Sequence, residues 1–240
     1  MSFVAEDFHR EEAAADAASK GGKWKRLIEE QYFPGAAYIT AASPLIGAEY
    51  QKYFPGQTFT VINNVFPKAQ QPTFQESKNG PLKLFWFSQT IGMDRGLDDV
   101  LNAMQLIPEI PIHLTLLGNC NDSLKQHFQS SSSSTEHTVR IYNPVEPEQI
   151  FSLAAEQDIG LALEPAFSKN NQIALSNKIF IRLNITTDNR GRKSRYCCLY
   201  SPRNMVAAVM IVIITIKSLE GLSFNCFHDV NDLMNPKRAI

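Results

Sequence analysis

Cysteine is scarce in this sequence, which has four cysteines in 240 residues and no CxxC pair. CxxC spacing is the usual sign of a structural zinc site, and the adjacent Cys197 and Cys198 do not suit a simple disulfide framework. The five histidines are also scattered, without the spacing of metal ligands. The sequence therefore predicts no metal site, and its cysteine usage fits the reducing cytoplasm.

Long apolar runs are absent as well. The longest covers residues 205–216, whereas a membrane-spanning helix needs about 20 apolar residues. At the N-terminus, Glu6 and Asp7 stand where a secretory signal would have its apolar core. We expect neither a transmembrane segment nor export, which leaves peripheral attachment to a membrane open.

The chain has no excess of charge of one sign, because its formal net charge is −1. No basic surface dominates, which argues against a nucleic-acid partner, and the basic residues within 188–195 are best explained as a solvated loop. Hydrophobic residues make up 44% and charged residues 20%, as in an ordinary globular protein. The length exceeds the usual domain size of about 100–150 residues, so one large α/β domain or two smaller ones are expected.

The first part of the chain predicts a small α/β unit. A helical composition from Arg10 to Tyr32 is expected to break at Gly21-Gly22, and a strand follows at 37–41. Ser43-Pro44 is a good N-cap and first-turn proline for a helix that ends near Phe54. A strand at 59–62 leads to a polar linker. We place a domain boundary near residue 70 and predict a first domain over 1–70.

Strands and helices then alternate, at 82–87, 96–107, 112–117, 122–129, 139–142, 147–155 and 159–163. This βαβ pattern predicts a Rossmann-like parallel sheet with helices on both faces. In such sheets ligands bind beyond the carboxyl ends of the strands, so the loops after 87, 117 and 163 are candidates for a site. We predict a second domain over 71–181 and a divergent tail over 182–240, in which 205–216 favours a buried strand.

Residues 82–101 have the layout of a phosphate-binding turn: an apolar strand, a small polar loop and a helix start, with Arg95 at the junction. N–H groups at a helix N-terminus favour an anion, and a guanidinium beside them can grip it with two hydrogen bonds. The alternative is that Arg95 pairs with Asp94, Asp98 or Asp99 on the same helix face. A nucleotide-bearing ligand is the first hypothesis.

The order of these pieces resembles the group 1 (family 4) glycosyltransferases, whose GT-B type fold joins two Rossmann-like domains across a cleft. The resemblance runs from about residue 5 to about 181, and Arg95-Gly96 stands where members commonly have Lys-Gly. It rests on six stretches, 37–45, 61–67, 88–97, 114–118, 158–164 and 176–180.

The resemblance implies transfer of a sugar from a nucleotide-sugar donor, usually with retention, without an obligatory metal or other cofactor. Members of this family often act in polysaccharide biosynthesis. It implies a donor site made of Ser88, Gln89, Gly92, Arg95, Gly118, Glu164, Asn177 and Lys178. Simpler roles stay open: Asn177 as an N-cap, Glu164 as the close of a strand, and the glycines as turn residues.

The sequence departs from this family in two ways. Of the family's N-terminal domain, only the last part has a counterpart in this sequence. We therefore predict no catalytic base. The missing part of that domain could be encoded separately. After Phe180 a β-branched polar run replaces the expected helix, and Gln172 stands where many members have a second carboxylate. The alternative function is a non-catalytic fragment or a nucleotide-binding or interaction module. A sugar-nucleotide epimerase is less favoured because its acidic and histidine pattern is missing.

Overall fold

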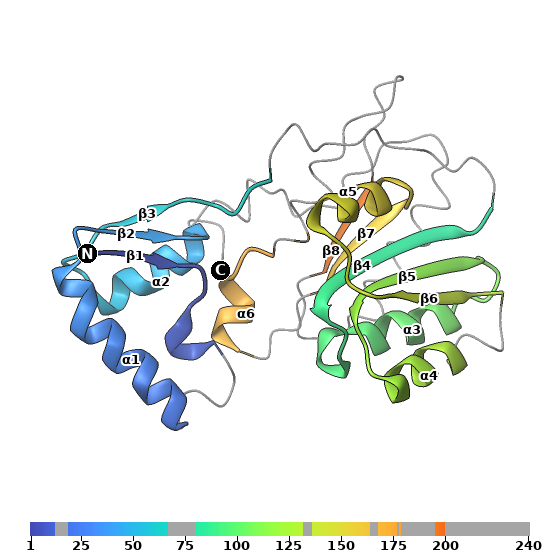
Figure 1. Cartoon of the computed structure of the whole chain (residues 1–240), viewed down its shortest axis with the longest axis horizontal. Helices are drawn as coiled ribbons and strands as arrows, with labels where there is room; N and C mark the ends of the chain where they lie inside the picture. The colour runs from blue at the N-terminus through green and yellow to red at the C-terminus, as the bar shows by residue number, and fades with distance from the viewer. Residues whose placement is uncertain are drawn as a thin grey trace, which may run out of the picture. The chain divides into compact units, whose positions relative to one another are not determined.

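The computed structural model describes residues 1–12, 19–66, 80–131, 136–163, 168–176, 178 and 195–199. They divide into two compact units (Figure 1). The first contains the described residues of Met1–Val65 and Pro165–Ser176, and the second those of Phe66–Glu164 and Asn177–Phe227.

The first unit is built on a three-stranded parallel sheet in the order β1-β2-β3. Its apolar residues pack on one face of this sheet, where Ile39 and Ala41 contact buried aromatic residues of the helical segments. Its elements are β1 (Ser2–Ala5), η1 (His9–Glu11), α1 (Lys20–Tyr32), η2 (Phe33–Gly35), β2 (Tyr38–Ala41), α2 (Pro44–Tyr53), β3 (Phe59–Val61) and α6 (Lys169–Ile173). The strand β1 was not predicted from the sequence.

The helices of this unit begin at serine caps. Ser43 Oγ accepts a hydrogen bond from the Ile46 N–H, which confirms the predicted start of α2. Ser19 caps α1 in the same way by accepting from the Gly22 N–H. The expected helix break at Gly21-Gly22 is therefore wrong: both glycines lie in the first turn of α1, where the serine cap compensates for their low helix propensity.

The short helix α6 belongs to the first unit although it is distant in sequence. Asn170 Oδ1 accepts a hydrogen bond of 2.7 Å from the Phe8 N–H, and Ser43 Oγ donates one of 2.9 Å to the Ile173 carbonyl. The sequence predicts 71–181 as one domain, whereas these contacts hold 168–176 with residues 1–65. No local pattern signals this return, because it depends on hydrogen bonds across more than 120 residues.

The second unit contains a five-stranded parallel sheet in the order β6-β5-β4-β7-β8. The predicted α/β class, with parallel sheets and helices, is confirmed. The elements are β4 (Leu82–Thr90), η4 (Met93–Arg95), α3 (Leu97–Gln105), β5 (Ile112–Asn119), α4 (Asp122–Ser130), β6 (Thr138–Tyr142), α5 (Pro147–Ala155), β7 (Ile159–Leu163) and β8 (Arg195–Leu199).

The fifth strand, β8, pairs with β7 in parallel, from Ile159↔Arg195 to Leu163↔Leu199. The sequence predicts a divergent tail of uncertain structure over 182–240, and β8 is a strand within it that was not predicted. The expected strand at 205–216 lies outside the described residues.

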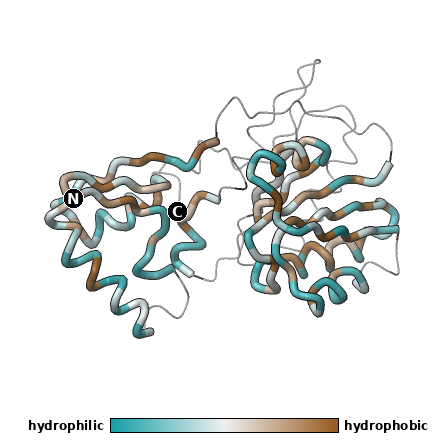
Figure 2. The backbone as a smooth tube through the Cα atoms, in the orientation of Figure 1, coloured by the Kyte–Doolittle hydropathy of each residue, from teal (hydrophilic) through white to brown (hydrophobic). Residues whose placement is uncertain are grey.

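Helices cover both faces of the second sheet. On one face, Leu84, Trp86 and Leu114 pack with residues of α3 and α4 such as Leu97 and Phe128. On the other, Phe85 and Leu117 pack against Phe151, Ala154 and Ala155 of α5. Figure 1 shows α3 and α4 on one side of these strands and α5 on the other, and Figure 2 shows the hydrophobic residues along them. No helix in the described part of the chain is long and apolar enough to span a membrane.

Candidate functional site

The candidate site lies at the carboxyl ends of β4 and β5, where η4 leads into α3. Gly96 is the N-cap of α3 and has φ of 72°, a left-handed conformation that glycine adopts at no steric cost. It supplies no side-chain cap, so the first N–H groups of α3 keep their capacity to donate. The sequence thus places an uncapped helix start directly after a buried strand.

Gly118 allows β5 to pass close to the loop that follows β4. A Cβ atom at this position would overlap the backbone carbonyl oxygen of Ser88 and lie 3.2 Å from Cγ1 of Ile91. The φ of Gly118 is also positive, at 154°. Any larger residue would push the two strand ends apart, so the glycine has a packing role in shaping the candidate loop.

Asn119 fixes the same loop, although it was not among the predicted site residues. Its carbonyl accepts a hydrogen bond of 2.8 Å from the Ile91 N–H, and its Nδ2 donates one of 3.0 Å to the Gln89 carbonyl. The available signal was its position directly after Gly118 at the end of a predicted strand. These two bonds hold the loop at Gln89 and Ile91. Of the two candidate residues here, Ser88 is half-buried and Gln89 is exposed.

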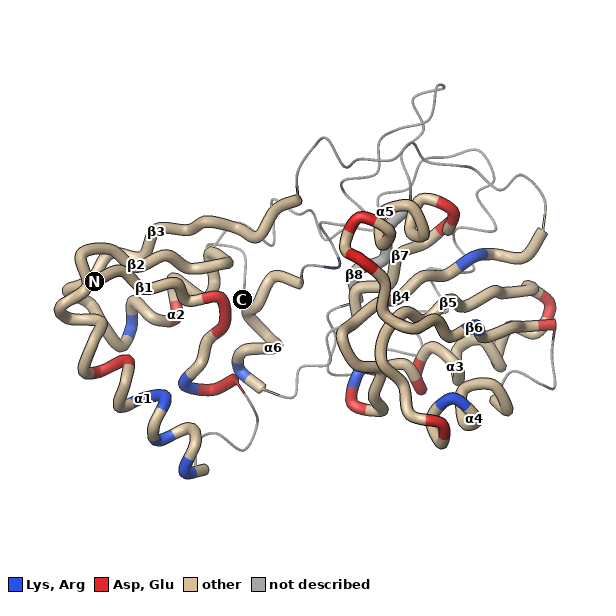
Figure 3. The backbone as a smooth tube through the Cα atoms, in the orientation of Figure 1, with Lys and Arg blue, Asp and Glu red and all other residues tan. Residues whose placement is uncertain are grey.

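Arg95 is half-buried and weakly engaged by the described residues. Its Nε lies 3.8 Å from Oδ1 of Asp94, an exposed neighbour. Of the other carboxylates considered for it, Asp98 contacts His127 Nε2 at 2.9 Å instead. Five guanidinium N–H groups and one distant contact leave Arg95 able to bind an anion at the start of α3. Figure 3 shows the charged residues of this region.

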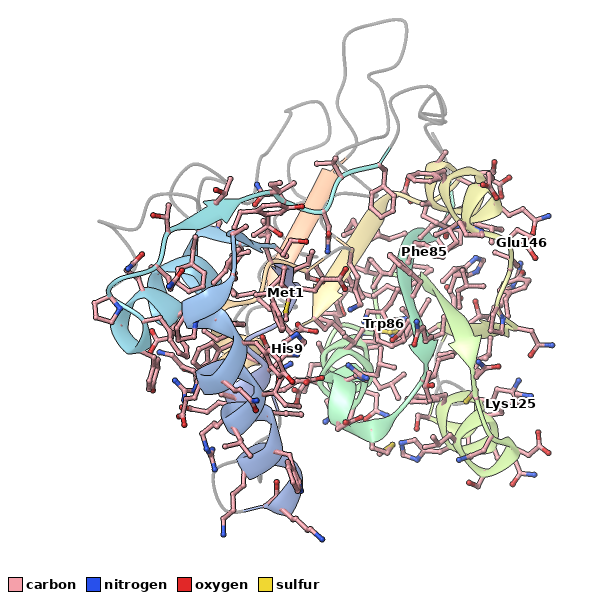
Figure 4. All side chains as sticks on the ribbon, turned by 60° about the vertical axis from the view of Figure 1, so that its left-hand side comes forward. Met1, His9, Phe85, Trp86, Lys125 and Glu146 are labelled. Carbon is pink, nitrogen blue, oxygen red and sulfur yellow. The ribbon has the colours of Figure 1, made fainter. Side chains whose placement is uncertain are left out.

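Lys178 reaches the same sheet from a segment far along the chain. Its Nζ lies 5.6 Å from the centre of the Trp86 ring, within the range of a cation–π interaction. Trp86 is fully buried in β4, two residues before Ser88, and Figure 4 labels it beside Phe85, whose side chain packs on the opposite face. This contact places Lys178, the second cation of the predicted donor site, against β4.

The structure describes six of the eight predicted donor-site residues. Gly92 is half-buried, and a Cβ there would meet only the Asp94 side chain closely, so it has no packing need like that of Gly118. Glu164 and Asn177 lie outside the described residues. The geometry therefore gathers Ser88, Gln89, Arg95 and Gly118 at one loop.

Among the described residues, no group of three or more histidines, cysteines or acidic residues is arranged to hold a metal ion. Cys120, next to this region, is half-buried, and burial raises the pKa of its thiol. A raised pKa keeps the thiol protonated at neutral pH, which disfavours a nucleophilic role. The chemistry available here is anion binding by cations and N–H dipoles.

No protein-family model and no curated protein matches the sequence. Solved structures do match the fold. A glycosyltransferase from Rickettsia africae aligns with a TM-score of 0.57 at 9% identity, over 83% of this chain and 57% of that one. A mutant of Staphylococcus aureus TarM, solved with fondaparinux, α-GlcNAc-glycerol and UDP, aligns with a TM-score of 0.52 at 8% identity, over 89% of this chain and 43% of that one.

These two alignments show similarity of fold. The chain has an α/β Rossmann-like arrangement similar to that of solved glycosyltransferases. It spans about half the length of the two solved chains.

Proposed function

We propose that the second unit binds a nucleotide-sugar donor at the carboxyl ends of β4 and β5 and that the protein serves in sugar transfer. The observation that carries this proposal is Arg95, a half-buried arginine with one contact of 3.8 Å among the described residues, beside the uncapped start of α3. A diphosphate is the anion that such a pair of features suits. The fold likeness to glycosyltransferases supports it.

In the proposed reaction the bond between the anomeric carbon of the sugar and the diphosphate oxygen breaks, while an acceptor hydroxyl bonds to that carbon and loses its proton to solvent. The leaving diphosphate keeps the electron pair of the broken bond and so develops negative charge. Arg95 and Lys178 would stabilise that charge, as preorganised cations and N–H dipoles do in other sites. Ser88, Gln89 and Gly92 would line the phosphate loop, while Glu164 and Asn177 would hydrogen-bond the ribose or sugar. Retention of configuration and the absence of any cofactor are further parts of the proposal. We also propose that the protein is a member of the group 1 family, serves in polysaccharide biosynthesis and is located in the cytoplasm.

The test is calorimetric titration of the chain with UDP, GDP and their common sugar conjugates. We expect saturable binding to the wild-type protein and at least tenfold weaker binding to Arg95→Ala, because a charge-assisted bidentate contact contributes about 1.5–3 kcal/mol. Lys125→Ala is the matched control, since Lys125 pairs with Asp122 on the surface of α4. Absence of binding by the folded wild-type chain would overturn the donor-site proposal.

A second candidate function is that of an interaction module, favoured by one face of the first sheet that the described residues leave exposed. Val4 and Tyr38 point away from the packed face and are 58% and 59% exposed. Parallel sheets are normally covered on both faces. We propose a separately encoded polypeptide as the occupant of this face, one that carries the remainder of a Rossmann-like domain.

Helix α1 supports the same candidate. Trp24, Leu27 and Ile28 form an exposed apolar stripe at the i, i+3, i+4 spacing of one helix face. Co-expression with neighbouring reading frames of the source genome, followed by size-exclusion chromatography, tests the idea. A stable complex that is lost in Val4→Lys supports it, and a complex that survives this substitution contradicts the assigned face.

A further inference from the structure

The second unit has a polar hollow on the α5 face of its sheet, away from the proposed donor loop. The hollow has a volume of about 130 Å³ and is lined by the start of β4, by the first half of β5, by Arg140 and Tyr142 of β6, and by α5 with the residues that follow it. Lys83 and His113 are register partners at the start of β4 and β5, and Thr115 is the partner of Arg140 in β6. Because β4 and β5 are parallel, Lys83 and His113 lie at the opposite end of these two strands from the loop at Ser88.

Three side chains that carry or can gain positive charge line this hollow: Lys83, His113 and Arg140. Among the described residues, no ion pair joins Lys83 or Arg140 to a carboxylate. The carboxylate that approaches Lys83, from Asp158, accepts a hydrogen bond of 2.9 Å from its main-chain N–H rather than from its ammonium group. Glu156 of the α5 end is exposed at the rim and forms no ion pair with either cation. Lys83 and Arg140 therefore line the hollow without an ion pair in the described part of the chain.

The state of His113 reflects this concentration of positive charge. Its pKa is lowered, first by burial and then by the charges of Arg140 and Lys83. The three groups are therefore close enough to interact electrostatically. An anion bound among them would offset the repulsion and raise the pKa of the imidazole.

Neutral polar groups complete the wall. Thr115 and Gln157 are more than nine-tenths buried, and their side chains are 3.5 Å apart, at the limit of a hydrogen bond. Gln157 Nε2 also donates to the Leu153 carbonyl at 3.2 Å. The hydroxyl of Tyr142, at the exposed rim, adds a donor. Buried polar side chains facing a hollow in this way are suited to an oxyanion, which accepts from several donors at once.

We propose that this hollow is a second anion site, which takes a single phosphate group between Lys83, His113 and Arg140. The volume limits the ligand, because pockets for drug-sized molecules measure about 300–1,000 Å³. A whole nucleotide is too large, whereas one phosphate fits. Inorganic phosphate and the phosphate of a small sugar phosphate share this chemistry.

The imidazole of His113 gives a local reporter for the test. The full chain is titrated with inorganic phosphate at constant ionic strength, and the His113 ring signals are followed by ¹H–¹³C NMR. We expect a saturable shift and an upward change in the His113 pKa. Arg140→Ala and Lys83→Ala should each weaken phosphate binding at least tenfold, since charged hydrogen bonds contribute about 1.5–3 kcal/mol each.

Two controls separate this site from other causes. Arg95→Ala should leave the His113 response to phosphate unchanged, so failure of the donor-site proposal does not affect the result. Lys125→Ala should do the same for a surface cation of the same unit. An equal response to chloride, or an unchanged response in Arg140→Ala, would overturn the second anion site. Tighter binding of glucose 1-phosphate than of phosphate would identify a phosphomonoester as the ligand, and equal binding the free ion.

Discussion

At the scale of residues, the first unit contains a buried polar cluster made of Arg10, Glu29 and Tyr50. All three side chains are buried, and Arg10 Nε lies 3.4 Å from Glu29 Oε2. The Tyr50 hydroxyl donates a hydrogen bond of 2.7 Å to Glu29 Oε1. Burial nevertheless raises the pKa of Glu29, because the arginine and the tyrosine offset only part of the cost of removing its carboxylate from water.

We expect Tyr50→Phe to destabilise the protein by about 1–3 kcal/mol at neutral pH, because it leaves the buried Glu29 carboxylate without its hydrogen bond. Since the pKa of Glu29 is raised in the folded state, the stability linked to this group is present at low pH. It is lost as pH rises through the folded pKa. The loss in Tyr50→Phe should therefore be smaller near pH 4.5 than at pH 7.

Urea unfolding at both pH values measures this difference. Tyr53→Phe is the matched control, because Tyr53 is exposed and its hydroxyl has one contact among the described residues, of 3.5 Å to Glu11. The variant keeps the Tyr53 ring, over which Arg10 lies at 3.8 Å. We expect the control to change stability by less than about 0.5 kcal/mol at either pH. An equal loss in both variants would contradict the assigned role of Tyr50.

At the scale of elements, Gly118 and Gly47 differ in whether their surroundings leave room for a side chain. A Cβ at Gly118 would overlap the Ser88 carbonyl, whereas at Gly47, inside α2, it would meet Ala41 and Phe59 at 3.5 Å, ordinary contact distances. We expect Gly118→Ala to destabilise the second unit by at least about 2 kcal/mol and to weaken nucleotide binding at the adjoining loop.

Gly47→Ala is expected to be neutral or to stabilise α2 by up to about 1 kcal/mol, because alanine has the higher helix propensity. Thermal unfolding and UDP titration of both variants give the comparison. If Gly118→Ala leaves stability unchanged, β4 and β5 can separate at this point without cost. That result would contradict the packing role assigned to Gly118.

At the scale of the whole molecule, the exposed face of the first sheet governs association. Val4, Tyr38 and the α1 stripe leave apolar surface uncovered in the described part of the first unit. Large exposed apolar patches mark interaction sites or promote aggregation. We expect the isolated chain to self-associate and Val4→Thr combined with Tyr38→Thr to shift it toward monomer.

Analytical ultracentrifugation over a concentration series measures that shift. Leu106→Thr is the control, since Leu106 is exposed singly at the end of α3 in the other unit. It should leave association unchanged. A monomeric wild-type chain at all concentrations would contradict the prediction.

Local patterns accounted for α2 of the first unit and for most elements of the second unit. Apolar runs and serine or proline starts predicted the helix after Ser43 and the strands that became β4, β5, β6 and β7 within a few residues. These signals act between near neighbours and therefore survive in the sequence alone. The strand ends were longer than predicted, because Asn119 pairs β5 with Thr90 beyond the apolar runs.

The sequence by itself determined the α/β class, the parallel sheet of the second unit and the candidate loop around Arg95, since periodicity and capping are local. Only the tertiary structure decided the return of α6 through Asn170, the added strand β8, the role of Asn119 and the hollow between Lys83 and Arg140. Each of these depends on groups brought together from distant parts of the chain, and no spacing of nearby residues encodes such contacts.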